Sequence, residues 1–200
     1  MLKNNLDAVS IAVPTTLHKD IALKAANYGV HMLVEKPIAE SLSSADAIID
    51  AARRENLKLM VGHIERFNPA ILKLKELISA GELGEIISIS CRRVGPFPPR
   101  IRDVGIITHK IRKVTITATG GVAHADYLEQ SLEIWKEGEV REGEIEKREP
   151  LKNELEYFMH AVVNGEEPSP SGEEGEYALY VAISAIESYE KGENIRLNLN

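Results

Sequence analysis

Residues 30-VHMLVEKP-37 decide the fold, because a short apolar run, 30–34, ends directly in Glu35, Lys36 and Pro37. Two further apolar runs, 7-DAVSIAV-13 and 57-LKLMV-61, lie on either side of it in the sequence. Runs of this length that are bounded by turn residues are typical of strands buried in a parallel sheet. Each of the three runs therefore predicts a strand.

The segments between these runs have the pattern of helices. Apolar residues recur at helical spacing in Lys19–Tyr28, and Gly29 is suited to end that helix. In the next segment, Ser43 or Ser44 offers an N-cap for a second helix. Strands and helices that alternate in this way predict βαβ units and a parallel sheet.

From residue 68 onward the pattern changes to that of antiparallel strands. Asn68 and Pro69 suit the N-cap and first position of a helix that ends at Gly81. Alternation of apolar and polar residues then predicts half-buried antiparallel strands. We expect strands at 85–93, 112–119, 122–128 and 131–135, a charged loop or edge at 137–149, helices from Leu151 and at 176–190, and a closing strand at 195–199.

These patterns predict an α/β protein of two domains. Residues 1–65 would form a parallel βαβαβ unit. Residues 66–200 would form an α+β domain with a mainly antiparallel sheet.

The composition is that of a globular protein, with 44% hydrophobic and 28% charged residues. A net charge of −7 argues against a nucleic-acid-binding protein, which usually carries a basic face. The single cysteine, Cys91, excludes an internal disulfide framework and alternates with Ile87 and Ile89, which predicts a core position. Without a signal-peptide pattern or an apolar run of about 20 residues, we expect a cytoplasmic protein with no membrane partner.

Polar residues follow all three strands of the predicted parallel sheet. Ligands of such sheets bind beyond the carboxyl ends of the strands, where 13-VPTTLH-18, 35-EKP-37 and 66-RFN-68 lie. A lysine at such an end can donate to a substrate oxygen or take part in proton transfer. Lys36 is therefore a candidate catalytic residue, with the alternative that it is a solvated charge before a strand-ending proline.

The run 12-AVPTTLHKDIALKAANYGVHMLVEKPIAES-41, followed by 61-VGHIERFNPAI-71, resembles the family of glucose-fructose oxidoreductase, inositol dehydrogenase and MocA (Gfo/Idh/MocA). Within it, 62-GHIERFNP-69 and 92-RRVGPFPPRIRDVG-105 look similar to the branch that acts on nucleotide-linked amino sugars, such as UDP-N-acetylglucosamine 3-dehydrogenases. The resemblance implies an NAD- or NADP-dependent enzyme that oxidises a secondary hydroxyl of a sugar or nucleotide sugar. It also implies that residues 1–65 are a partial Rossmann unit, the C-terminal half of a dinucleotide-binding domain, and that residues 66–200 serve substrate binding and oligomerisation.

The resemblance also implies roles for individual residues. Lys36 would be the catalytic residue beside the nicotinamide and the oxidised carbon. The cofactor would contact Pro14, Thr15, His18, Glu35, Lys36 and Arg66. The substrate would contact Lys36, Asn68, Arg93 and Arg100. A metal site is not expected, because His124 and His160 lack metal-ligand spacing, and His31 on a strand suits a structural role.

The chain departs from the family pattern in two places. Its glycines never have the Gly-x-Gly-x-x-Gly spacing of the turn that holds the pyrophosphate. In addition, 103-DVGII-107 runs directly into 108-THKIRK-113, without the family's Asp-x-x-x-His and its acid/base histidine. We therefore expect an N-terminal truncation and an internal deletion near residues 107–108, and a chain whose dinucleotide binding is weakened.

Three hypotheses about function follow. The first is an NAD(P)-dependent sugar oxidoreductase that contains Lys36, and the second is a non-catalytic, oligomerising or sugar-binding remnant. The third is that another polypeptide supplies the rest of the Rossmann domain and covers the edge of the strand at 7–13. In this family the antiparallel sheet commonly packs against another subunit, so we expect a homo-oligomer. The preference for NAD or NADP depends on a segment that this sequence does not contain.

Overall fold

The computed structural model describes residues 6–95 and 110–198. The chain forms two compact units. The first consists of Met1–His63 together with Glu154–Asn200, and the second of Ile64–Asn153. An α/β fold with a parallel Rossmann-like sheet and a separate antiparallel sheet is thereby confirmed.

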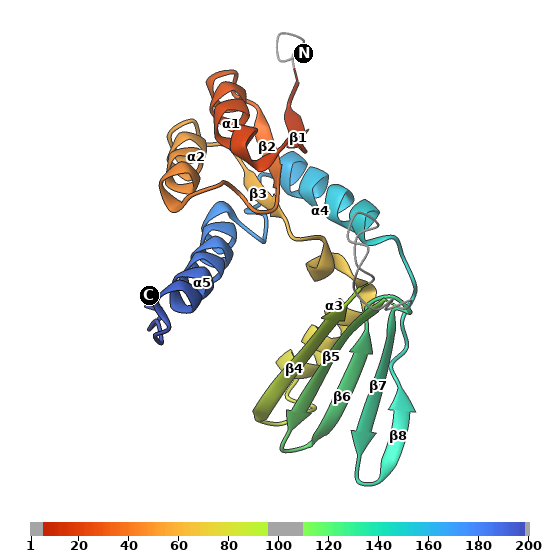
Figure 1. Ribbon diagram of the computed structural model, residues 1–200. Coiled ribbons are helices and arrows are strands. Elements are labelled where there is room, and N and C mark those ends of the chain that lie inside the picture. The colour runs from red at the N-terminus through yellow and green to blue at the C-terminus, as the bar shows by residue number, and fades with distance from the viewer. Residues whose placement is uncertain (1–5, 96–109, 199–200) are drawn as a thin grey trace. The chain divides into compact units, whose positions relative to one another are not determined.

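The first unit is built on a parallel sheet with the strand order β1-β2-β3 (Figure 1). In its register Ala8 pairs with His31, and Met32 pairs with Leu59. The elements in chain order are β1 (Ala8–Ile11), η1 (Thr15–Leu17), α1 (His18–Asn27), β2 (His31–Glu35), α2 (Leu42–Arg54) and β3 (Leu59–Gly62). Each predicted strand and helix of this part of the chain is therefore present.

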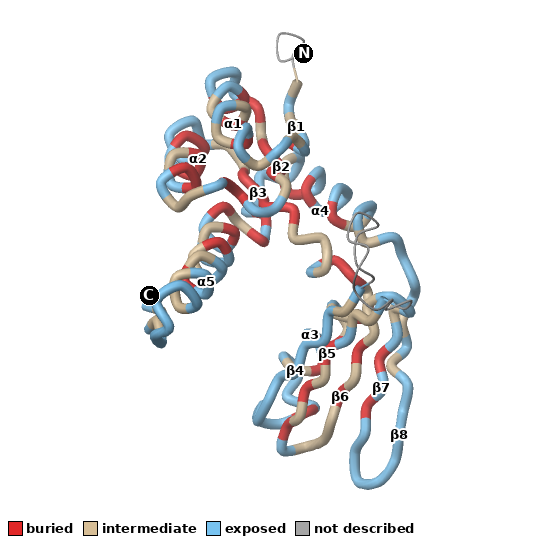
Figure 2. The backbone as a smooth tube through the Cα atoms, in the orientation of Figure 1, coloured by how far each residue is buried: buried red, intermediate tan, exposed pale blue. Residues whose placement is uncertain are grey.

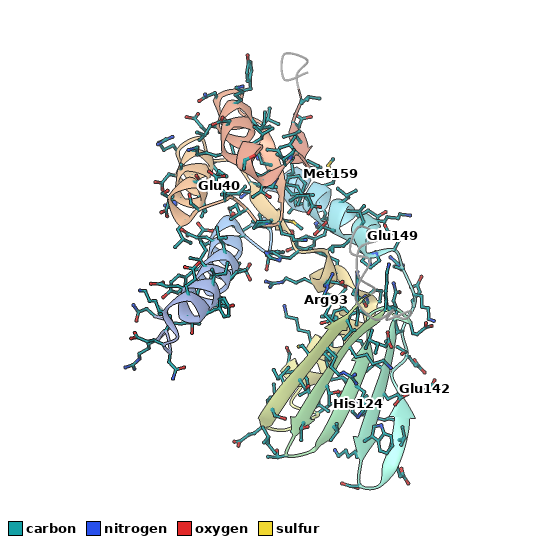
Figure 3. All side chains as sticks on the ribbon, viewed as in Figure 1. Glu40, Arg93, His124, Glu142, Glu149 and Met159 are labelled. Atoms are coloured by element: carbon teal, nitrogen blue, oxygen red, sulfur yellow. The ribbon has the colours of Figure 1, made fainter. Side chains whose placement is uncertain are left out.

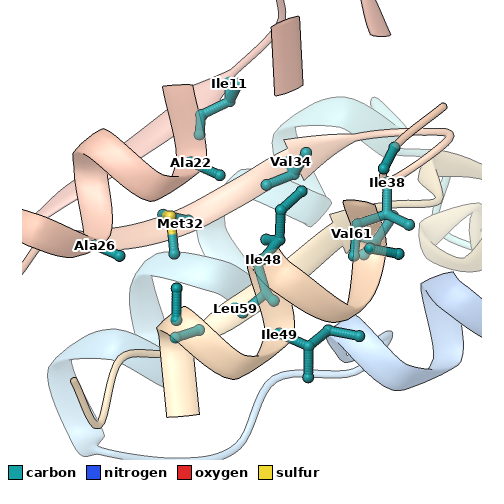
Figure 4. Packing of buried hydrophobic residues seen from close by; sticks show 14 of the residues in the cluster. Ile11, Ala22, Ala26, Met32, Val34, Ile38, Ile48, Ile49, Leu59 and Val61 are labelled. Carbon is teal, nitrogen blue, oxygen red and sulfur yellow. The ribbon is translucent and has the colours of Figure 1, made fainter. Parts of the chain in front are cut away.

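Apolar side chains of α1, α2 and the sheet form the core of the first unit (Figure 4). Ile48 of α2 is fully buried in the same cluster as Met32 and Val34 of the central strand. The small residues Ala22 and Ala26 form the buried face of α1, which lets that helix pack closely on the sheet. Burial of a side chain such as Ile48 stabilises the fold by about 1.5–3 kcal/mol.

The N-cap of α2 is Ser41, so the prediction of Ser43 or Ser44 is wrong. Ser41 has extended backbone angles, and its Oγ accepts the N–H of Ser44 at 3.2 Å. Ser44 lies within the helix, and its hydroxyl donates to Glu40 Oε1 at 2.9 Å. The helix starts earlier than predicted because Leu42 is already its first residue.

The two C-terminal helices are α4 (Pro150–Asn164) and α5 (Gly172–Lys191). Helix α5 packs on β3 and α2, and the N–H of Val61 donates to the carbonyl of Pro170 at 3.0 Å. The sequence-based division at residues 65/66 assigned both helices to the second domain. In the structure the chain leaves the first unit after His63 and returns to it at Glu154, because the apolar face of α5 completes the core over β3.

The second unit contains a five-stranded antiparallel sheet with the order β4-β5-β6-β7-β8. Asn68 caps its first helix and Pro69 is the first helical residue, as predicted. The elements are η2 (Ile64–Phe67), α3 (Pro69–Ser79), β4 (Ile86–Val94), β5 (Ile111–Ala118), β6 (Gly121–Asp126), β7 (Ser131–Lys136) and β8 (Glu139–Glu142). The exposed strand β8 lies in the stretch predicted to be a charged loop or edge.

Burial alternates along the central strands of this sheet, whereas β4 and β8 are exposed (Figure 2). Helix α3 packs on β6 and β7 and covers the face that carries Val114 and Ile116. Ile89 and Cys91 pair with these two residues and so share their face. The predicted core position of Cys91 is nevertheless wrong, because β4 is the first strand in the order of the described sheet and the Cys91 thiol is exposed.

The closing strand predicted at 195–199 is also wrong over its described part. Residues 194–198 have no regular secondary structure. The N–H of Asn198 donates to the hydroxyl of Tyr180 at 3.4 Å. Residues 195–198 alternate between apolar and polar side chains, but they pair with no strand in the described part of the chain.

Candidate functional site

The carboxyl ends of the three parallel strands meet at one edge of the first unit's sheet. Ile11, the last residue of β1, pairs with Val34, and Glu35 at the end of β2 pairs with Gly62 at the end of β3. The segments that carry Pro14, Lys36 and His63 therefore leave the sheet on the same side. This arrangement agrees with the strand-end position that the sequence predicts for the site.

Lys36 is exposed directly beyond the end of β2. Its backbone N–H donates to Glu35 Oε2 at 3.2 Å. Within the described parts of the chain, its ammonium group makes no ion pair or side-chain hydrogen bond. An ammonium group without a partner, at the edge where parallel sheets bind ligands, is available to a ligand oxygen.

Gly62 lies beside Glu35 and leaves space for its side chain. A Cβ at Gly62 would be 3.3 Å from the Glu35 carboxyl carbon and 3.4 Å from its Cα. A larger residue at position 62 would push the Glu35 side chain aside. Sequence reasoning missed this residue, since the cross-strand pair depends on the register of β2 and β3.

His18 is 1% exposed, at the first position of α1. Its Nδ1 lies 3.0 Å from the carbonyl oxygen of Pro37 and 3.3 Å from that of Ile38. Its Nε2 lies 2.9 Å from the carbonyl oxygen of Val13. The predicted cofactor-binding residue therefore has its ring inside the unit, between the loops that follow β1 and β2.

Pro14 and Thr15 belong to the loop after β1. Pro14 is exposed and Thr15 is half-buried. The carbonyl of Pro14 accepts the N–H of Leu17 at 2.8 Å, which closes the turn η1. The structure thus brings Pro14, Thr15 and Lys36 to the same edge of the sheet.

Arg66 and Asn68 belong to the second unit. Arg66 is exposed on η2. Asn68 is 1% exposed, and its Oδ1 accepts the N–H of Ala70 at 3.1 Å while its Nδ2 donates to the carbonyl of Tyr127 at 2.9 Å. These bonds give Asn68 a structural function in joining α3 to the turn after β6.

Arg93 is exposed near the end of β4 (Figure 3). Its guanidinium lies 3.5 Å from Glu65 Oε1, which also accepts a hydrogen bond from Arg112 at 3.1 Å. Arg112 is directly opposite Arg93 in the register of β4 and β5. The two arginines and Glu65 form an ion cluster that sequence reasoning missed, because residues 93 and 112 meet only through strand pairing. Arg100 lies outside the described residues.

The pKa of Tyr127 lies above its ordinary value. Burial is the largest cause, and the charges of Cys91 and Glu65 act in the same direction while that of Arg93 opposes them. The Tyr127 phenol therefore remains a neutral hydrogen-bonding group near the Glu65 cluster over the physiological pH range.

His31 and His124 have structural contacts. His31 Nδ1 accepts the N–H of Lys58 at 2.8 Å, and burial lowers its pKa, aided by the Lys58 charge and opposed by Asp7. His124 bonds the Thr115 hydroxyl at 2.9 Å and packs edge-on against Trp135 (Figure 3). Over residues 6–95 and 110–198, no group of three or more His, Cys, Asp or Glu side chains could hold a metal ion. None of the helices described combines the length and apolar character needed to cross a membrane.

Comparisons with known proteins agree with this fold. The oxidoreductase family with an NAD-binding Rossmann fold, GFO_IDH_MocA, matches residues 1–63. UDP-N-acetylglucosamine 3-dehydrogenase of Acidithiobacillus ferrooxidans is 41% identical over 102 residues, which are 51% of this chain and 31% of that protein. Scyllo-inositol 2-dehydrogenase (NAD(+)) of Bacillus subtilis is 39% identical over 82 residues, 41% of this chain and 24% of that protein.

A solved structure of the Acidithiobacillus enzyme superposes with a TM-score of 0.80 at 26% identity, over 88% of this chain and 76% of that one. The resemblance to the Gfo/Idh/MocA family that the sequence indicates is thereby confirmed. The chain spans about a third or less of the length of these curated relatives in the sequence alignments.

Proposed function

Because residues 1–63 match the model of the GFO_IDH_MocA oxidoreductase family with its NAD-binding Rossmann fold, we propose that this chain acts in NAD(P)-dependent oxidation of a sugar or nucleotide sugar. The observation that carries the proposal is Lys36, whose exposed ammonium lies at the carboxyl edge of the parallel sheet and has no partner among residues 6–95 and 110–198. The names of the relatives, a UDP-N-acetylglucosamine dehydrogenase and an inositol dehydrogenase, support polyhydroxylated substrates.

The residues at the sheet edge fit a dinucleotide. Pro14 and Thr15 offer an accessible loop beyond β1, and Gly62 keeps the Glu35 side chain beside the end of β3. When bound, NAD(P) supplies the hydride acceptor. Lys36 would orient the secondary hydroxyl by a hydrogen bond and, as the free amine, would accept the hydroxyl proton, while Glu35 fixes the backbone of Lys36.

Arg93 supports a substrate that carries phosphate. It is exposed, and its ion pair with Glu65 at 3.5 Å is long enough for a stronger anion to compete. A guanidinium binds phosphate oxygens in a bidentate geometry, which suits a nucleotide sugar.

The test is a fluorescence titration of the purified chain with NADH and with NADPH, alongside Lys36→Ala. We expect saturable binding with a Kd of about 1 mM, because the chain lacks the glycine spacing that cradles a pyrophosphate. Lys36→Ala should weaken it, and the control Lys24→Ala, on the exposed side of α1, should not. Absence of binding to either dinucleotide would favour the second hypothesis, a non-catalytic remnant, or the third, a half-enzyme that needs another polypeptide.

We also propose that the chain forms a homo-oligomer through the open face of its antiparallel sheet. Trp135 is 48% exposed and Val140 is 51% exposed, and the two pair across β7 and β8 beside half-buried Val122. An exposed aromatic and aliphatic cluster of this kind is typical of an interface. Sedimentation velocity should show an assembly that Trp135→Arg dissociates, and a monomeric wild-type chain would contradict the proposal.

A further inference from the structure

The ring of His18 lies between two loops that the sheet itself does not hold together. The parallel ladder between β1 and β2 ends at the pair Ile11 and Val34. Beyond it, the first loop continues through Val13 to Pro14, and the second through Lys36 to Pro37. The His18 ring contacts the carbonyl of Val13 with one nitrogen and the carbonyl of Pro37 with the other.

We propose that His18 is a positioning residue that joins the loop after β1 to the loop that carries Lys36, and so fixes the place of Lys36 at the sheet edge. Val13 directly precedes the exposed Pro14, and Pro37 directly follows Lys36. A shift of the ring would therefore move residues on both sides of the site. The proposal rests on the proposed function, in that Lys36 is the group whose position matters.

Burial makes the ring a rigid connection. His18 is 1% exposed, and Ile38 and Ala39, which follow Pro37, are fully buried. A buried ring with few free torsions transmits the position of one loop to the other, because well-packed interiors are stiff. A ring nitrogen that carries an N–H donates to the carbonyl oxygen that it faces. Loss of the ring nitrogens would remove these contacts to partly buried carbonyl oxygens of both loops.

The charges near the ring come from neighbouring elements. The pKa of Glu40 lies below its ordinary value, chiefly through a backbone hydrogen bond and one from the Ser44 hydroxyl, with smaller contributions from the charges of Lys19 and His18. Glu40 is exposed and bonded to Ser44 at 2.9 Å, so it holds the end of the Lys36 loop to α2. Ser44 and His18 thus anchor this loop at its two ends.

Three substitutions of His18 distinguish a role in positioning the two loops from a role that only fills space in the core. His18→Phe keeps a ring but removes both nitrogens. His18→Asn places an amide donor near the position of Nδ1, and His18→Gln near that of Nε2. The control is His31→Phe, which removes a half-buried ring with one backbone contact at the opposite end of β2.

The first readout is the backbone amide NMR signals of Thr15, Lys36 and Ile38, recorded with the melting temperature. His18→Phe should shift the signals of both loops, whereas His31→Phe should lower the melting temperature and leave them in place. His18→Asn should restore the signals of Lys36 and Ile38, and His18→Gln that of Thr15. A His18→Phe variant that changes only the melting temperature would overturn the proposal.

The second readout is NADH affinity. His18→Phe should weaken it by about tenfold if displacement of Lys36 matters for binding. Because the NMR signals are recorded without cofactor, the loop connection through His18 and the proposed function can each be refuted without the other. A wild-type chain that does not bind NADH would remove the proposed function and leave the loop connection standing. Unchanged loop signals in His18→Phe would remove the connection whatever the affinity.

Discussion

Substitution of Gly175 by alanine tests the packing of α5 on β3. A Cβ at this position would lie 2.4 Å from Val61 Cγ2 and 2.9 Å from Val61 Cβ. Val61 is fully buried and β-branched, so it cannot rotate away, and we expect the upper end of the overpacking range, about 3 kcal/mol. Alanine returns about 1 kcal/mol through its higher helix propensity. The net loss of about 2 kcal/mol should lower the melting temperature by about 4–8 °C in a chain of this size.

The assay is thermal unfolding followed by circular dichroism, with two controls. Val61→Ala removes both methyl groups that the new Cβ would meet and keeps only the Val61 Cβ contact at 2.9 Å, so Gly175→Ala should cost clearly less in that background than in the wild-type chain. Gly95→Ala should have no effect, because a Cβ there meets nothing within 4 Å. If the losses from Gly175→Ala and Val61→Ala simply add, α5 does not contact β3 at this point and the reasoning is refuted.

Three further predictions concern titration, the thiol and the cap of α3. Burial and the Asp46 carboxylate raise the pKa of Glu176 above its ordinary 4.5. The protonated Glu176 side chain therefore contributes stability below pH 4.5, and this contribution is lost as the pH rises through the raised pKa. Glu176→Gln should raise stability near pH 7 by a few tenths of a kcal/mol, and a urea-denaturation difference that does not vary with pH would contradict this. Cys91 should react with an aromatic disulfide reagent as completely in the native chain as after unfolding, and a native thiol that does not react would show that β4 is covered. Asn68→Ala should cost about 2–3 kcal/mol in chemical denaturation, and Asn68→Ser, which keeps a cap, should recover about 1 kcal/mol, whereas equal losses would place the cost in the bond to Tyr127 alone.

Local signals in the sequence predict most of the elements. The apolar runs become β1, β2 and β3, and Asn68-Pro69 begins α3, because these signals act within a few residues. The errors come from longer-range effects. Cys91 alternates with apolar neighbours as a core residue does, yet its strand lies at the edge of the described sheet and its thiol is exposed. Alternation predicts on which face of the sheet a side chain lies. Whether another element covers that face depends on residues far away in the sequence.

The candidate site was predictable in its position and only partly in its detail. The strand-end rule places Lys36 and the Pro14 loop at one edge, and the structure agrees. The same rule cannot tell that the ring of His18 turns inward, since that depends on carbonyl oxygens of two loops. The Glu65 cluster was equally hidden, because Arg112 meets it only through the pairing of β4 with β5.

The position of Lys36 depends on residues more than a hundred positions later in the chain. Lys36 leaves β2, β2 is held on one side by β3, and β3 is held in turn by the Pro170 segment and α5. Glycines at 172 and 175 permit this contact, since a Cβ at either would lie within 3 Å of apolar side chains of the first unit. A substitution in α5 that reduces dinucleotide binding therefore acts through support of the Lys36 strand. If residues 66–200 were instead a substrate domain, the same substitution would act on the substrate pocket. The two explanations differ in that only loss of support for the Lys36 strand would also lower the stability of β3.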